Sequence, residues 1–251
     1  MRGVLTSPPM SLAIDAALRD EMAPTGRLRV ALNLGNFLLV SQDAASGALR
    51  GVAADLGADI AARFGVPHDL VPYETAGKVA DGAREQWDVA FIGAEPAREN
   101  VIAFSPAYVE IDATYLVPAD SPITSIDEVD RAGVRIATAE RSAYDLYLTR
   151  TIRHATLVRA PGIPASFDRF VADRLDVLAG LKPRLIADHA RLPGSRILEG
   201  RFTAIQQSMG APRPRTRAAR WLAAYSVEAR RSGLVADAIR RHGVVGLTVA
   251  A

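Results

Sequence analysis

Apolar runs that lack the in/out alternation of a half-exposed strand alternate along this chain with segments of helical periodicity. Residues 27–34 (RLRVALNL) and 87–93 (WDVAFIG) are such runs, whereas residues 51–65 repeat apolar side chains every four positions from Val52 to Phe64. Strands buried on both faces read as continuous apolar runs, and amphipathic helices follow the four-residue interval. The pattern predicts an α/β fold with parallel sheets covered by helices on both faces.

The same alternation starts again in the second half of the chain. Residues 133–139, 155–160 and 175–180 are predicted strands, and residues 142–152 and 163–174 between them are predicted helices. An extended stretch joins the two units, and two more helices follow the second unit. Two similar α/β units indicate two lobes with a cleft between them, where the carboxyl ends of the strands meet a ligand.

Composition excludes several chemistries. The 251 residues, 49% hydrophobic and 23% charged, are typical of a folded globular chain long enough for two lobes. Cysteine is absent, which removes disulfides, thiol nucleophiles and cysteine zinc sites, and the four histidines lie far apart without metal-ligand spacing. We therefore expect no metal and no cofactor.

The basic residues do not form a nucleic-acid surface. Net charge is +2, and Lys78 and Lys182 are the only lysines among the 30 basic residues. The arginine clusters lie on predicted helices without interleaved aromatic residues, which favours a solvated helix face. No segment approaches the ~18 consecutive apolar residues of a membrane span. We expect neither a nucleic-acid partner nor membrane insertion.

The first residues lack the apolar core of a secretory signal, because Asp15, Arg19 and Asp20 interrupt it. The sequence as it stands therefore predicts a cytoplasmic protein. A trimmed leader, or a true start at Met10, is the alternative, and it would make the protein periplasmic.

One strand end in the first unit carries groups suited to an anion. Gly93 closes a strand and lets the backbone approach a ligand, and Arg98 offers a planar fork of donors that matches a carboxylate or phosphate. The alternative, at about even odds, is that Arg98 caps its own turn or pairs with Glu95 or Glu99.

Two other strand ends complete the predicted cleft. Arg141 and Ser142 begin a helix whose free amides and dipole favour a negative group, although a plain capped helix explains either residue alone. Asn33, Asn36 and Phe37 follow the first strand and supply two amides and an aromatic ring, or form a plain turn. The matching positions of Arg98 and Arg141 in the two units favour a shared site.

The order of these segments resembles the bilobal solute-binding proteins of polar amino-acid ABC transporters, bacterial extracellular solute-binding protein family 3. The resemblance covers residues 26–243 and is carried by GRLRVALN, GALRGVAADLGADIAARFGV, WDVAFIG, an arginine followed by IAFSPAY, SPITSIDEVDRAGVRIA, LDVLAG and IQQSMGAP. It implies a type II periplasmic-binding-protein fold, with each lobe a mostly parallel sheet flanked by helices. The implied lobes are residues 1–117 with 208–251, and residues 118–207.

The resemblance also implies a hinge and a ligand site. The hinge falls near residues 115–118 and 203–207, and Arg98 matches the arginine that grips the ligand carboxylate. The implied site contains Asn33, Asn36, Phe37, Gly93, Ala94, Glu95, Arg98, Thr138, Arg141, Ser142, Gly180 and Gln206. This chain departs from the family where Gly180 falls near the ammonium-binding aspartate and where the stretch before Arg98 is shorter and lacks a hydroxyl. An acid without a free α-amino group therefore fits at least as well as an amino acid.

These features predict a monomeric, non-enzymatic protein that clamps a small carboxylate or zwitterion between its lobes for ABC-type transport or sensing. Its macromolecular partner, if it is exported, would be a transporter permease. The alternative is an enzyme similar to the cyclohexadienyl dehydratases, with Glu95, Glu140 or Asp145 as the acid. Motifs for phosphate cradling, serine hydrolysis and zinc proteolysis are missing. A regulator's effector domain would need a DNA-binding unit within the 26 residues before Arg27, which are too few.

Overall fold

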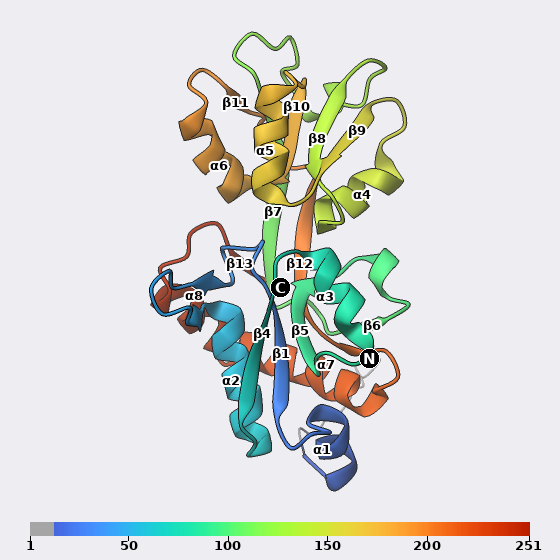
Figure 1. Cartoon of the computed structure of the whole chain (residues 1–251), viewed down its shortest axis with the longest axis vertical. Helices are drawn as coiled ribbons and strands as arrows, with labels where there is room; N and C mark the ends of the chain where they lie inside the picture. The colour runs from blue at the N-terminus through green and yellow to red at the C-terminus, as the bar shows by residue number, and fades with distance from the viewer. Residues whose placement is uncertain (1–12) are drawn as a thin grey trace, which may run out of the picture.

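The computed structural model describes residues 13–251 and has two lobes connected by two long strands (Figure 1). The connecting strands are β7 (Val109–Val117) and β12 (Thr203–Pro212). The alternative start at Met10 lies outside the described residues. The two-lobed α/β fold predicted from the sequence is confirmed.

In the lower lobe of Figure 1, three parallel strands carry the first apolar runs of the sequence. β1 (Leu28–Asn33) pairs in parallel with β4 (His68–Tyr73) on one side and with β5 (Val89–Gly93) on the other. Every residue of β5 is buried, as its continuous apolar run predicts. β12 continues this sheet beyond β5 in the antiparallel direction.

Helix α2 (Val52–Phe64) covers this sheet with the apolar face that its periodicity predicts. Leu56, Ile60 and Phe64 are fully buried. Gly57 lets the helix approach β1, because a Cβ added there would lie 2.8 Å from Cγ1 of Val30. The tight contact between helix and strand therefore depends on this glycine.

The upper lobe repeats the arrangement. β8 lies between β9 and β10 and runs parallel to both, whereas β10 is antiparallel to β7. The strands are β8 (Arg135–Ala139), β9 (Thr156–Ala160) and β10 (Val177–Leu181), and the helices are α4 (Ala143–Thr151), α5 (Ile163–Ala172) and α6 (Lys182–Arg191). The strands and helices predicted for the second unit are confirmed.

The strand register corrects one half of the predicted hinge. Residues 203–207 of β12 pair with residues 109–113 of β7, at the crossing between the lobes. Residues 113–116 of β7 instead pair with β10, and residues 116–117 pair with β11 (Arg196–Ile197). The expectation of a crossing near residues 115–118 is therefore wrong, because those residues already belong to the upper sheet.

The last part of the chain returns to the lower lobe, as Figure 1 shows. Helices α7 (Thr216–Arg231) and α8 (Leu234–Arg241) are separated at Ser232 and Gly233, as predicted. β13 (Thr248–Val249) then pairs with β7 beside the crossing. The other elements are α1 (Ala16–Met22), β2 (Ser41–Gln42), β3 (Leu49–Arg50), α3 (Ala76–Asp81), η1 (Gly82–Arg84), η2 (Pro96–Arg98), β6 (Ile102–Phe104) and η3 (Ile126–Glu128). Within residues 13–251, no helix combines the length and apolarity needed to span a membrane.

Candidate functional site

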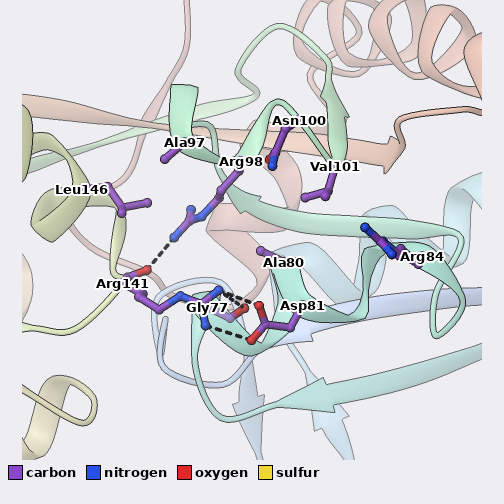
Figure 2. Close-up of a pocket in the computed structure, with 10 residues that line it drawn as sticks. All are labelled: Gly77, Ala80, Asp81, Arg84, Ala97, Arg98, Asn100, Val101, Arg141 and Leu146. Carbon is purple, nitrogen blue, oxygen red and sulfur yellow. Dashed lines mark hydrogen bonds and ion pairs between the residues drawn. The ribbon is translucent and has the colours of Figure 1, made fainter.

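Arg98 lies where the two lobes meet. Pro96 begins the short helix η2 directly after β5, and this turn carries the Arg98 side chain between the lobes. Its side chain is buried, with 3% exposed. Nη1 donates to the Gly93 carbonyl at 2.6 Å. Nη2 donates to the Arg141 carbonyl of the other lobe at 2.7 Å (Figure 2). Arg98 therefore connects the end of β5 to the loop before α4.

The Arg98 guanidinium has no ion pair with any residue in the described range 13–251. Burial lowers the pKa of Arg98 to about 10. The nearby Glu95 raises this pKa, and the nearby Arg141 lowers it further. The group stays protonated at neutral pH, and both of its hydrogen-bond acceptors are neutral carbonyls. Buried charges in proteins are ordinarily paired, so this cation is suited to an incoming anion.

Arg141 makes the second contact between the lobes. It has a positive φ of 56°, and its side chain lies against Gly77 of α3. A Cβ added at Gly77 would lie 3.1 Å from Cβ, Nε and Cζ of Arg141. Nη1 and Nη2 of Arg141 donate to the two carboxylate oxygens of Asp81 at 2.8 and 2.6 Å (Figure 2). This is a bidentate ion pair across the interface.

A third contact joins Glu95 after β5 to Arg150 on α4 through a salt bridge. The Glu95 side chain is 6% exposed, and burial raises its pKa although Arg150 opposes the rise. We call the pairs Arg141–Asp81 and Arg150–Glu95 the interlobe latch.

The amides predicted to bind a ligand at the start of α4 are bonded within the chain. The Arg141 amide donates to Oδ2 of Asp145 at 2.9 Å, and the Ser142 amide donates to the Ala139 carbonyl at 3.1 Å. Ser142 caps the helix by accepting from the Asp145 amide at 3.1 Å. Asp145 thus supplies the negative group that a helix start favours, and burial raises the pKa of its carboxyl. A ligand role for Arg141 and Ser142 stays a prediction.

A small cavity of about 40 Å³ lies at the lobe interface near the end of β1. Asn33 and Ser142 line it together with two acidic residues, Glu74 and Glu140. Oδ1 of Asn33 accepts from the Gly35 amide at 3.1 Å. The structure therefore brings two predicted site residues together beside two carboxyl groups.

Three other predicted residues do not line this small cavity. The Asn36 side chain is buried, and its Oδ1 has no partner among the described residues. The hydroxyl of Thr138 on β8 is likewise buried and unpartnered in the described part of the chain. Phe37 is 44% exposed, so it does not form a closed aromatic wall in this arrangement. Their roles stay predictions.

The end of β5 and strand β12 are joined at the interface by contacts of Gly93, Ala94 and Gln206. A Cβ added at Gly93 would lie 2.9 Å from Cβ of Ala143 on α4, so the glycine permits the close approach of the lobes. The Ala94 amide donates to the Gln206 carbonyl at 2.8 Å. The Gln206 side-chain amide donates to the Ala204 carbonyl at 3.3 Å. These contacts position the loop that carries Arg98.

A ligand role for Gly180 stays a prediction. A Cβ added at Gly180 would lie 2.9 Å from Cδ2 of Leu185 on α6, within the core of the upper lobe. Leu181, the next residue on β10, belongs to another buried cluster, which also contains Tyr144 of α4. Successive strand residues point to opposite faces, so these two neighbours face the cores on the two sides of the sheet.

A larger cavity of about 410 Å³ opens beside Arg98 (Figure 2). Sequence analysis predicted only Arg98 and Arg141 among the residues that line it. Asp81, Arg84 and Asn100 were missed, because their position depends on how α3, η1 and η2 pack together, and no motif in the sequence marks them.

Two α/β lobes with charged side chains at a shared interface, connected by two crossing strands, define the class of two-lobed solute-binding proteins. The sequence profile of the bacterial extracellular solute-binding proteins, family 3, matches residues 28–242. The chain belongs to this family.

Solved structures share the fold at low sequence identity. An amino acid ABC transporter substrate-binding protein from Streptococcus pneumoniae, bound to L-arginine, is 17% identical, with a TM-score of 0.73 over 88% of this chain and 96% of that chain. A solute receptor for L-cysteine from Neisseria gonorrhoeae is 17% identical, with a TM-score of 0.74 over 89% and 92%. An ancestral amino-acid-binding protein, a precursor of cyclohexadienyl dehydratase, is 19% identical, with a TM-score of 0.72 over 90% and 99%.

Proposed function

We propose that this protein binds a small carboxylate-bearing solute, an amino acid or a related organic acid, between its two lobes. The observation that carries the proposal is the Arg98 guanidinium, which is buried at the lobe interface without an anionic partner among the described residues. Membership of the solute-binding family supports the same conclusion.

The contacts of Arg98 indicate how the ligand would bind. Nη2 now donates to the neutral carbonyl of Arg141. A carboxylate in that place would add an opposite charge to the hydrogen bond and could accept from the guanidinium through both oxygens, a contact that contributes about 1.5–3 kcal/mol. The lobes would have to separate for the ligand to enter, and closure would follow because both lobes then contact it.

The small cavity is lined by acidic residues that could pair with the amino group of a ligand. Glu74 and Glu140 line it, and Lys78 pairs with Glu74 from within the same lobe. We propose that Glu140, on the opposite lobe, is the cation partner if the solute is an amino acid. The similar protein bound to L-arginine and the similar receptor for L-cysteine favour this class of solute.

We further propose that the protein serves ABC-type transport or sensing. Transport would require export from the cytoplasm, whereas sensing would not. Cell fractionation with an antibody against the protein separates the two: a periplasmic fraction supports transport, and a cytoplasmic fraction supports sensing.

A thermal-shift screen of the purified protein tests the binding proposal. Amino acids, keto acids and organic acids are added at about 1 mM, each beside a matched amine or amide that lacks the carboxylate. A ligand at about 100 times its Kd adds about 2.7 kcal/mol, which raises Tm by several degrees. We expect shifts only from compounds with a free carboxylate. Equal shifts from the carboxylate-free analogues would overturn the proposal.

The alternative is a dehydratase-like enzyme, favoured by the likeness to the ancestral precursor of cyclohexadienyl dehydratase. Glu95 and Asp145 have pKa values raised by burial, as a general acid requires. Both carboxyl groups, however, also bind arginine side chains, which favour the ionised form. Turnover of prephenate or arogenate by the purified protein would establish this alternative, and tight binding without turnover would exclude it for these substrates.

A further inference from the structure

A second cavity shares part of its lining with the cavity beside Arg98. A cavity of about 440 Å³ lies next to the one of 410 Å³, and Arg84, Asn100 and Val101 line both. The first cavity begins at the lobe interface, and the second extends along the lower lobe to Arg213. We call the two together the cationic groove.

The charges along this groove are unequal. Five arginines and one aspartate line it: Arg84, Arg98, Arg141, Arg213, Arg215 and Asp81. Asp81 is neutralised by Arg141, and Arg215 pairs with Asp88, which does not line the groove. Within residues 13–251, the other three arginines make no ion pair. A concave surface with one sign of charge raises the local concentration of oppositely charged solutes.

The free cations lie at separate points. Figure 2 shows Arg98 and Arg84 on opposite sides of the first cavity, with Ala80 and Val101 between them. Arg98 is buried, whereas Arg84 is exposed where the two cavities join. Two guanidinium groups separated by an apolar floor match a molecule with an acidic group at each end and methylene groups between them.

We propose that the solute is an organic dianion with two carboxylates, one bound by Arg98 and the other by Arg84. This inference rests on the proposed function, because it assumes that Arg98 is the first carboxylate site. It adds a second anionic group that the likeness to amino-acid receptors does not supply.

Titration calorimetry with matched acids tests the inference. Malonate, succinate, glutarate and adipate are compared with their monoamides, which keep one carboxylate and nearly the same length. We expect at least one diacid to bind about tenfold or more tightly than its monoamide. Arg84→Ala should remove this advantage and weaken monoamide binding much less, because the neutral amide oxygen gains only a hydrogen bond from Arg84 whereas the second carboxylate gains an ion pair. Arg84 is exposed, so the variant should unfold at the wild-type temperature.

Arg220→Ala is the matched control, since Arg220 is an exposed arginine on α7 that lines neither cavity. It should keep the full preference for the diacid. Equal affinity for diacid and monoamide, or an unchanged preference in Arg84→Ala, would overturn the inference. If both compounds bind equally and Arg98→Ala abolishes both, the proposed function stands and only the second carboxylate site fails. If no acid binds, both the proposed function and the second carboxylate site fail.

Inorganic phosphate is titrated in a separate experiment. If phosphate binds in a way that depends on Arg84 while no diacid binds, the groove is a phosphate site and the dicarboxylate proposal is wrong.

Discussion

Arg98 is the residue whose chemistry was predictable from the sequence and whose surroundings were not. Its place five residues after a buried strand predicts a cation at a strand end. The sequence left open a pair with Glu95 or Glu99, but Glu95 pairs with Arg150 from the other lobe. That choice depends on the approach of α4, which no local pattern encodes.

Glu95 gives a prediction at this scale. Burial raises the pKa of Glu95 above its ordinary value, so the ionised carboxylate is less stable in the folded protein than in the unfolded chain. The stability that the protonated Glu95 carboxyl contributes is fully present below its pKa in the unfolded chain. It is lost as the pH rises through its pKa in the folded protein. We expect Glu95→Gln to raise the free energy of unfolding at pH 7, and the gain to vanish as the pH falls below the unfolded pKa.

Urea unfolding of both proteins at several pH values measures this difference. Asp145→Asn is a second test of the same sign, because burial also raises the pKa of Asp145. A Glu95→Gln protein that is less stable than wild type at pH 7 would show that the pair with Arg150 outweighs the cost of burial.

At the scale of the elements, the helices and strands were predictable because their periodicities are local. The break between α7 and α8 agrees with prediction. The position of the hinge on β7 was not predictable, since it depends on the register in which β7 pairs with β10, β11 and β12.

Gly57 on α2 gives the prediction for an element. Gly57→Ala places a methyl group 2.8 Å from Val30, and overpacking of this kind costs about 1–3 kcal/mol, partly offset by about 1 kcal/mol of improved helix propensity. We expect a net loss of about 1 kcal/mol in urea unfolding. In a Val30→Ala background the contact is gone, and the same change should stabilise the protein. Destabilisation of equal size in both backgrounds would contradict this packing account.

At the scale of the whole molecule, the interlobe latch could not be predicted from the sequence. Arg141 and Asp81 belong to different lobes and meet only when α3 faces the start of α4. Both side chains are about half exposed, and an ion pair of this kind contributes at most about 1 kcal/mol. The Arg141–Asp81 pair should therefore bias lobe closure by no more than about fivefold, and salt should weaken it.

Asp81→Ala tests the latch through the separation of the lobes. The chain has no cysteine, so Ala62→Cys on α2 and Ala187→Cys on α6 provide two specific labelling sites. We expect Asp81→Ala to lower energy transfer between the dyes. Asp69→Ala is the control, because Asp69 forms a similar bidentate pair with Arg27 inside one lobe. Equal transfer in all three proteins would show that the latch does not hold the lobes.

The measurement that tests the central claim most directly is titration calorimetry of wild type and Arg98→Ala with the best carboxylate from the screen. Losing a charge-assisted pair worth about 1.5–3 kcal/mol should weaken binding at least about tenfold, with cooperative urea unfolding retained. An Arg98→Ala protein that binds the ligand with wild-type affinity would contradict the assignment of Arg98 as the anion site.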